Sequence, residues 1–146
     1  MKLLSGPQIF LRYAFRPCAE EKMKAGKIDK CSYERMEVII EENDVPPILL
    51  LEKCFPNAVT DYKRFCLEFK RKDNFSRESV INYWRYNHDG PTPVKHAIVC
   101  MIDDNGIVKV ISDGEAENAI NPYKLILRKE DLVFIHNSII VEKDED

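Results

Sequence analysis

The chain has 146 residues with a formal net charge of −3 at pH 7, and 45% of its residues are hydrophobic. This length and apolar content are enough for one ordinary core or two small ones, which excludes a disordered protein. The longest uncharged apolar run, residues 45–51, is far below the roughly 20 residues needed to cross a bilayer. We therefore expect a soluble protein with no membrane association.

The start of the chain does not predict a secretion signal, because Gly6, Pro7 and Arg12 interrupt any apolar run. A disulfide framework is not expected either, since an odd number of irregularly spaced cysteines would leave one unpaired. We expect thiols in a cytoplasmic protein. The cysteines are Cys18, Cys31, Cys54, Cys66 and Cys100.

From residue 7 to residue 86 apolar side chains recur every three or four positions, which is the spacing of helices. Prolines and glycines divide the region, because a proline starts a helix more readily than it continues one. Ser32 and Ser76 are expected N-caps, since their hydroxyls can accept a hydrogen bond from the first turn. The expected helices cover residues 7–15, 17–26, 32–43, 48–54 and 56–72, with a last one after Ser76.

A cluster of helix breakers at residues 89–93 ends this region. A strand is expected at 94–102, with Ile98 and Ile102 on one face and Met101 on the other. Asn105-Gly106 between two β-rich runs predicts a hairpin. Further strands are expected at 107–111, 116–120, 123–127, 132–136 and 139–141, with Asn137-Ser138 as the turn of a closing hairpin.

The change of period near residue 90 predicts an α+β protein with two domains. Residues 1–90 are expected to form a bundle of short helices packed on a small β-barrel of five or six strands, residues 91–146. Closure into a barrel is expected because open strand edges would remain unpaired otherwise. The helical part holds 16 Lys and Arg against 14 Asp and Glu, whereas the barrel part holds 6 against 11.

The strands of the last third resemble the hydrogenase assembly chaperone family (HypC/HupF). The resemblance rests on the first hairpin, residues 97–110, on the late strand DLVFIH at 131–136, and on the apolar run IIVEK at 139–143. Members of that family are small β-barrels with a late strand of the pattern Gly-Asp-aromatic-Val-aliphatic-Val-His. The resemblance implies a barrel that docks on a protein partner, such as a metalloenzyme or a maturation factor.

The family's opening motif is absent. Its members begin with Met-Cys-Leu-(Gly or Ala)-Ile-Pro, and that cysteine is implicated in holding iron. This chain begins Met1-Lys2-Leu3-Leu4, and the start of the expected barrel, residues 91–94, contains no cysteine. Only His136 matches a family position with a suggested metal-related role. The resemblance therefore implies docking and does not extend to iron carriage.

Metal binding by His96, Cys100 and His136 is an alternative function, with iron or zinc as the ion, although no cofactor is predicted. His96 and Cys100 share a face of one strand, but at about 3.3 Å per residue they lie too far apart to ligate one ion without a bulge. Either could join His136 from a neighbouring strand. No paired Cys-x-x-Cys motif supports zinc. If neither histidine binds a metal, we expect His96 to lie at the mouth of the barrel and His136 to lie in a turn.

A second alternative is a barrel protein that binds single-stranded nucleic acid. Residues 62–72, YKRFCLEFKRK, mix basic and aromatic side chains, as such proteins do. On a helix, however, the aromatic side chains fall on one face, which is typical of core packing. The acidic barrel also disfavours phosphate binding. A protein partner is expected instead of nucleic acid.

No motif of a phosphate loop, a serine hydrolase or a zinc protease is present, so we expect a non-catalytic binding or assembly module. His88-Asp89 can do acid–base work but names no reaction by itself. The barrel residues expected to bind are His136 and His96. Four further candidates are expected at a surface where the two domains join: Arg12, Arg16, Trp84 and His88.

Overall fold

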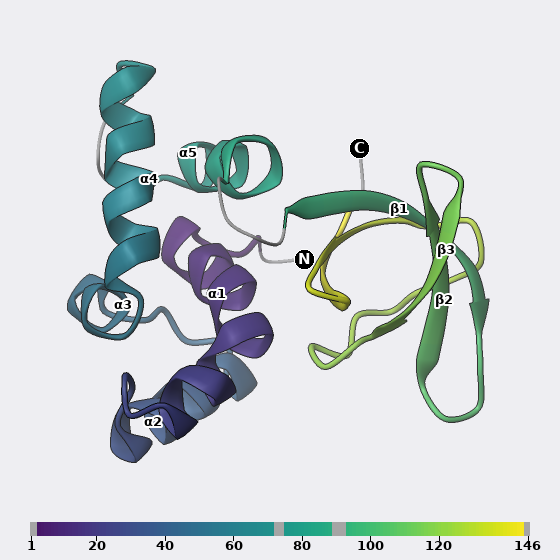
Figure 1. The fold of residues 1–146 in the computed structure, drawn as a ribbon, viewed down its shortest axis with the longest axis horizontal. Coiled ribbons are helices and arrows are strands. Elements are labelled where there is room, and N and C mark those ends of the chain that lie inside the picture. Colours follow the sequence, from purple (N-terminus) through teal and green to yellow (C-terminus); the bar gives the residue numbers. More distant parts are fainter. Residues whose placement is uncertain (1–2, 72–74, 89–92, 145–146) are drawn as a thin grey trace. The chain divides into compact units, whose positions relative to one another are not determined.

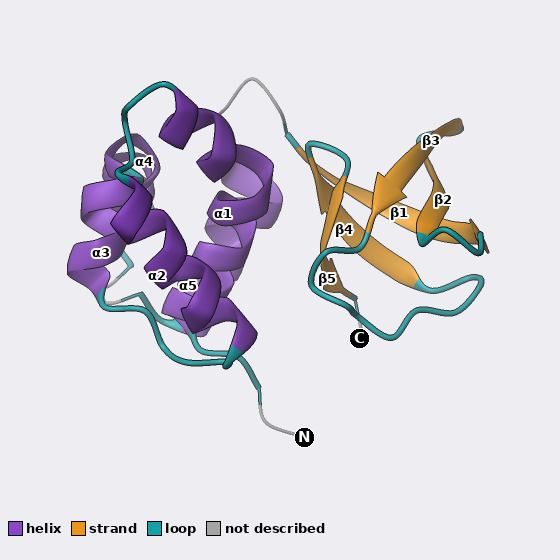
Figure 2. Cartoon of the chain, turned by 90° about the horizontal axis from the view of Figure 1, so that it is seen from below, coloured by secondary structure: helices purple, strands orange, loops and turns teal. Residues whose placement is uncertain are grey.

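The computed structural model describes residues 3–71, 75–88 and 93–144, without the side chains of residues 17 and 18. The described chain is α+β, as expected. It divides into two compact units, Met1–Asp89 and Gly90–Asp146, which we call the helical unit and the sheet unit. Figure 1 follows the chain through both units, and Figure 2 distinguishes helices from strands.

The described part of the helical unit contains five α-helices and a π-helix. Helix α1 contacts α2, α3 and α5, while α4 contacts α3 and the π-helix. The elements are α1 (Gly6–Lys24), α2 (Lys30–Glu41), α3 (Ile48–Cys54), α4 (Pro56–Glu68), α5 (Arg77–Asn82) and the π-helix η1 (Tyr83–Asn87).

Helix α1 begins in a capping box, in which the side chains of Ser5 and Gln8 each accept a hydrogen bond from the other residue's backbone N–H. The expected break at Pro17 is wrong, because α1 continues to Lys24. An interior proline costs about 3 kcal/mol. Buried residues before and after it, such as Phe15 and Ala19, keep the helix packed along its length. The helices expected at 7–15 and 17–26 are therefore one.

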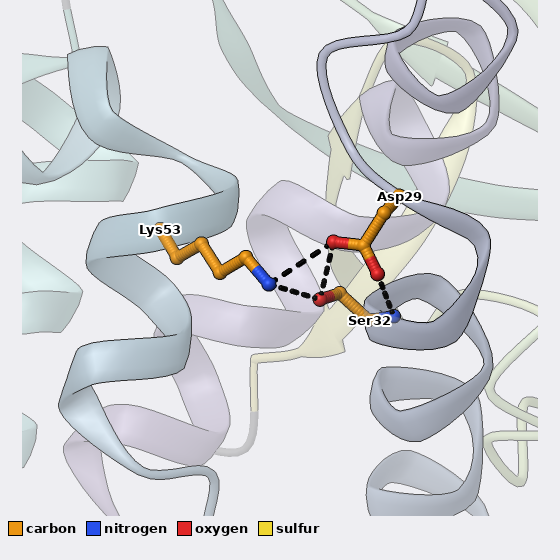
Figure 3. A network of polar contacts seen from close by, with 3 residues as sticks. All are labelled: Asp29, Ser32 and Lys53. Atoms are coloured by element: carbon orange, nitrogen blue, oxygen red, sulfur yellow. Dashed lines mark hydrogen bonds and ion pairs between the residues drawn. The ribbon is translucent and has the colours of Figure 1, made fainter.

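Helix α2 is capped by Asp29, so the prediction of Ser32 as its N-cap is wrong. The Asp29 carboxylate accepts hydrogen bonds from the Ser32 backbone N–H at 2.9 Å and from the Ser32 hydroxyl at 2.8 Å. Lys53 of α3 joins this network through the Ser32 hydroxyl and the Asp29 carboxylate (Figure 3). A carboxylate at the N-cap is also stabilised by the positive end of the helix dipole, whereas an uncharged serine is not.

Replacing Asp29 by asparagine is expected to lower the melting temperature at neutral pH and to matter less in acid. Hydrogen bonds from Ser32, backbone first, and then Lys53 hold the pKa of Asp29 well below its ordinary range. The folded chain therefore binds fewer protons here than the unfolded chain. This contribution is complete above an ordinary aspartate pKa of about 4 and is lost as the pH falls through the folded-state value.

Thermal unfolding followed by circular dichroism from neutral to acid pH measures this effect. Asp104→Asn is the matched control, because it removes the same charge from an exposed turn. A destabilisation by Asp29→Asn that is the same at every pH would contradict the assignment. The expected effect is a few degrees at most, since the half-exposed Asp29–Lys53 pair is screened by solvent.

Ser76 caps α5, as predicted, and its hydroxyl accepts the Ser79 backbone N–H. After Asn82 the helix widens into η1, a π-helical turn of the kind that often marks a local irregularity. Helix α4 ends at Glu68, shorter than the expected 56–72, and Lys70 follows with a positive φ of 55°. Position 72 lies outside the described residues.

The core of the helical unit is aromatic. Phe10 of α1 lies 5.9 Å from the ring centroid of Tyr62, 5.4 Å from that of Phe75 and 5.3 Å from that of Trp84. All four are nearly inaccessible to solvent. Edge-on and tilted ring contacts at these distances are favourable beyond the area they bury. The cluster therefore joins aromatic residues from α1, α4 and η1 with Phe75, which lies before α5.

The described part of the sheet unit is a five-stranded mixed sheet. The pairing order is β1-β2-β3-β5-β4, and β4 also pairs with β1, so the sheet closes on itself. The strands are β1 (Val94–Ile102), β2 (Ile107–Ser112), β3 (Glu115–Ile120), β4 (Leu132–His136) and β5 (Ile139–Lys143). The contact between β3 and β5 is short, because these strands share the single parallel pair Ile120–Ile139.

Three tight turns set the strand order. The hairpin predicted at Asn105-Gly106 is present, and the Asp103 carboxylate accepts hydrogen bonds from the N–H groups of Asn105 in the turn and Ile107 at the start of β2. Asp113-Gly114 joins β2 to β3 with positive φ at both residues. The predicted Asn137-Ser138 turn is also present, with φ of 53° and 62°. Positive φ at two central residues matches the right-handed twist of the flanking strands.

The strand expected at residues 123–127 is wrong, because the chain there is a loop. The Asn121 side chain takes the place of a strand partner: its Oδ1 accepts the Leu125 N–H at 3.0 Å, and its Nδ2 donates to the Leu125 carbonyl at 2.8 Å. Leu125 and Leu127 pack against the sheet core, whereas Ile126 between them is 81% exposed. Packed and exposed side chains do alternate over these three residues, but they belong to a loop and not to a strand.

Candidate functional site

The outer face of the closed sheet contains a row of apolar side chains from four strands. Paired residues of adjacent strands point to the same face. Leu132 pairs with Ile98, Ile98 with Ile111, and Ile111 with Ala116. Leu132, Ile98 and Ile111 are 41%, 37% and 38% exposed, and Ala116 is exposed too. We call these four residues the apolar row.

The inner face explains why the row points outward. Residues that alternate with it, such as Ala97, Val99 and Val110, are nearly inaccessible and form the core of the sheet unit. Strands of a closed sheet alternate between inside and outside. An antiparallel sheet with one buried face usually has polar residues on the other. The apolar row departs from that rule.

A β-bulge extends the apolar surface. The register of β1 and β2 shifts between Val99 and Met101, so Cys100 is the extra residue. Met101 therefore pairs with Lys109 and shares the face of Ile98, contrary to the expected alternation. Met101 is 57% exposed. A strict period of two could not predict this, because the bulge moves every later side chain to the opposite face.

Together the apolar row, Met101 and Ile120 form what we call the apolar face. Ile120 pairs with Ile107 beyond the Lys109–Asn118 pair and is 47% exposed. Among the outward positions of β1, β2 and β3 from residue 98 onward, Lys109 is the charged side chain. Singly exposed apolar residues are ordinary, but contiguous ones on adjacent strands mark interaction surfaces.

His96 lies beside this face. Its ring stacks on Phe134, the residue paired with it on β4, with centroids 4.6 Å apart. Its Nε2 is 3.0 Å from a carboxylate oxygen of Asp144, which follows β5. Asp144 is thus held against the sheet by His96. His96 is half-exposed and can contact a partner without leaving the sheet.

The metal candidates are not brought together. Val94, two residues before His96, pairs with His136, so the two histidines lie on neighbouring strands, but His136 is buried. Cys100 occupies the bulge, where its Sγ contacts the Ile98 carbonyl at 3.8 Å. In the described part of the chain, no group of three or more His, Cys, Asp or Glu residues could hold a metal ion.

Trp84 and His88 lie together in the helical unit, in contact at 4.4 Å between ring centroids. The Tyr83 hydroxyl donates to Asp61 of α4 at 2.7 Å and lies 3.1 Å from Nδ1 of His88. Because the hydroxyl hydrogen is directed to Asp61, His88 presents an Nδ1–H to the phenol oxygen. This network joins α4 to η1. Sequence reasoning missed Asp61 and Tyr83, which are distant from each other along the chain.

Arg12 and Arg16 connect α1 to the end of α2. Arg12 donates to the Asn43 side chain at 3.0 Å. Arg16 lies 3.6 Å from a carboxylate oxygen of Glu37, and its guanidinium lies over the ring of Phe15. Both arginines thus contact other residues of the helical unit, and these contacts explain their positions without a ligand.

The basic stretch of α4 also has internal contacts. Lys63 pairs with Glu52 at 3.5 Å, and Arg64 pairs with Asp61 at 3.3 Å. Tyr62 and Phe65 are buried, so their rings are covered and cannot stack on bases.

Cys54 and Cys66 are buried as well, and burial raises the pKa of the Cys54 thiol and keeps it protonated. Both cysteines therefore belong to the core of the helical unit.

The described chain is therefore an α+β protein with a helical unit, a closed five-stranded sheet and an exposed apolar face on that sheet. No family model, no curated protein and no solved structure matches it. None of the helices in the described residues has both the length and the apolar composition that crossing a membrane requires.

Proposed function

We propose that this chain is a non-catalytic protein-binding module that docks a partner through the apolar face. The observation that supports this most directly is the apolar row, in which Leu132, Ile98, Ile111 and Ala116 follow one another in register across four strands. Water around a contiguous apolar surface is released when a partner covers it, which favours association. The face has the composition of an interface core, where charged residues are scarce.

The charge of the sheet unit indicates the chemistry of the partner. Residues 91–146 contain 6 Lys and Arg against 11 Asp and Glu. None of the described acidic residues belongs to the apolar face, and exposed ones such as Asp104 and Asp113 lie in the turns that join its strands. An interface of this kind gains affinity from its apolar centre, while charges at the rim select the partner and speed association. The partner is a protein with an apolar patch bordered by Lys and Arg.

The resemblance to the hydrogenase assembly chaperones is part of this proposal. It assigns the sheet unit to their class of small β-barrels and the partner to the metalloenzymes or their maturation factors. The first hairpin and the closing hairpin, on which the resemblance rests, are both β-hairpins here, which supports it. His96 and His136 then lie beside the docking surface. No observation favours metal or nucleic-acid binding in its place.

A paired substitution tests the docking surface. Ile98→Asp with Ile111→Asp places two charges in the centre of the apolar row, and partner recovery from native lysate is expected to fall at least about tenfold. Ile126→Asp is the matched control, because Ile126 is more exposed but belongs to the loop before β4 and not to the row. Quantitative mass spectrometry of the captured proteins compares the two variants with the unmodified chain.

The unmodified chain and the Ile126→Asp control are expected to capture a metalloenzyme or a maturation factor that the double variant loses. Circular dichroism first establishes that both variants fold, since the substituted side chains already contact water. A captured set that does not depend on Ile98 and Ile111 would refute docking through the apolar face. A face-dependent partner of another kind would refute the hydrogenase-related part alone.

A further inference from the structure

A groove opens in the sheet unit where β1 separates from β2. Strand β1 pairs with β2 from Ile98 to Ile102 but with β4 from Val94 to Ile98. The first half of β1 therefore has a β-strand neighbour on one side only. On the other side lies a groove of about 530 Å³, with the β2–β3 turn as its far wall.

The main chain of β1 presents hydrogen-bonding groups to this groove. The N–H and C=O of one residue in an antiparallel strand point to the same side, and successive residues alternate. The Val99 N–H and C=O bond to the Asp131 and Glu130 backbone on the β4 side. The His96 carbonyl instead accepts the Ser112 hydroxyl at 2.9 Å, on the β2 side. By this alternation, the main-chain groups of Val94 and His96 point into the groove.

Open strand edges bind extended segments of other chains. Exposed N–H and C=O groups are a template for another strand, and several protein families bind peptides by adding a strand to such an edge. Here the edge is short and lies at the bottom of a groove, which limits the bound segment to a few residues. The pairing groups are the N–H and C=O of Val94 and the N–H of His96, because the His96 carbonyl already accepts the Ser112 hydroxyl. The partly buried Val94 side chain lines the groove.

The charges at the groove select a basic segment. Lys95 is paired with Glu117 at 3.2 Å, and Glu117 also accepts the Ser138 hydroxyl at 3.1 Å. The groove is also lined by Asp113 and Glu115, both exposed. With Lys95 neutralised by Glu117, the remaining charge is negative. A Lys or Arg side chain of an added strand would face these two carboxylates.

We propose that this groove binds an extended, basic segment of a partner protein as an added β-strand on Val94 and His96. The site goes beyond docking on the apolar face, because it depends on main-chain hydrogen bonds and carboxylates in place of apolar area. The two surfaces adjoin at Ala116, so one partner can occupy both. Each can nevertheless be removed separately by substitution.

The probe is a short capped peptide in which Lys and Val alternate, titrated into the full chain and followed by amide NMR shifts. The largest shifts are expected at Val94, His96 and Ser112. The same peptide with alternate backbone nitrogens methylated has equal charge but cannot pair as a strand, and it is expected to bind at least about tenfold more weakly. Equal binding of both peptides, or no shifts at these residues, would overturn the proposal.

Val94→Pro and Val94→Ala are the matched protein variants. Proline removes the N–H that points into the groove and leaves the β1–β4 hydrogen bonds of Lys95 and Ala97 in place. Alanine shortens the side chain and keeps the N–H. Peptide binding is expected to fall at least about tenfold in Val94→Pro and to persist in Val94→Ala. Equal affinities of the two folded variants would show that the edge is not used.

Charge is tested with Asp113→Asn combined with Glu115→Gln, which keeps side-chain size. The Lys-Val peptide is expected to bind the double variant more weakly and with a smaller dependence on salt. A Glu-Val peptide that bound the unmodified chain equally well would refute the basic preference. Sedimentation of the chain alone provides a further outcome: dimerisation abolished by Val94→Pro would assign the groove to a second copy and overturn the proposal.

Discussion

Replacing Phe10 by alanine is expected to lower the free energy of unfolding by about 3 to 5 kcal/mol, the usual cost of removing a buried phenylalanine. The ring is inaccessible and contacts Tyr62, Phe75 and Trp84. Its loss leaves a cavity between aromatic rings that cannot collapse without moving three separate segments. Urea denaturation of the full chain, followed by tryptophan fluorescence, measures the loss close to the affected site.

Leu49→Ala is the matched control for this substitution. Leu49 belongs to the same unit but is 78% exposed, so its replacement is expected to change the free energy of unfolding by no more than about 0.5 kcal/mol. Similar losses for Phe10→Ala and Leu49→Ala would contradict the packing described for α1. A large loss for Phe10→Ala with an altered denaturant slope would point to a changed unfolded state.

Replacing Ile135 by alanine is expected to destabilise the sheet unit by about 2 to 5 kcal/mol. Ile135 lies on β4 with 1% of its surface exposed and belongs to the sheet core with Ala97 and Val133. Both sides of β4 are paired, to β1 and to β5, so the strand cannot shift to fill the cavity. Hydrogen exchange at the β1 and β4 amides measures the loss within this unit alone.

Ile126→Ala removes the same atoms from a side chain that is 81% exposed, and it is expected to leave amide exchange in β1 and β4 unchanged. The pair therefore separates burial from side-chain chemistry. If both variants accelerated exchange equally, Ile126 would have to be part of the core, contrary to its exposure. If neither did, the inner face of β4 would not be close-packed.

Local signals predicted the elements well where they agreed with the packing. The change from helical to strand period, the Asn105-Gly106 hairpin, the Ser76 cap and the Asn137-Ser138 turn are all present. Each depends on a few adjacent residues whose hydrogen bonds or φ angles are locally determined. Such features need little information from the rest of the chain.

Predictions failed where a distant or unexpected partner decided the outcome. Packing on both sides of Pro17 kept α1 continuous, and the Asp29 carboxylate, supported by Lys53, took the capping position expected for Ser32. The side chain of Asn121 satisfied the Leu125 backbone and replaced an expected strand by a loop. In each case tertiary packing or side-chain hydrogen bonding outweighed local preference.

The candidate site shows the same division. His96 could be recognised as a residue on the first strand, but its stacking on Phe134 and its contact with Asp144 depend on closure of the sheet. The apolar row could not be recognised at all. Its members are far apart in the sequence, and only strand register places Leu132 beside Ile98 and Ile98 beside Ile111.

The sequence by itself determined the two-part α+β organisation, the hairpins and the excess of acidic residues after residue 90, because periodicity, turn chemistry and charge are properties of neighbouring residues. Only the tertiary structure decided which face of each strand is exposed. The bulge at Cys100 reverses the alternation in β1, and the unequal pairing of β1 with β2 and β4 opens the groove at Val94 and His96. Both follow from strand register, which pairs residues that the chain keeps apart.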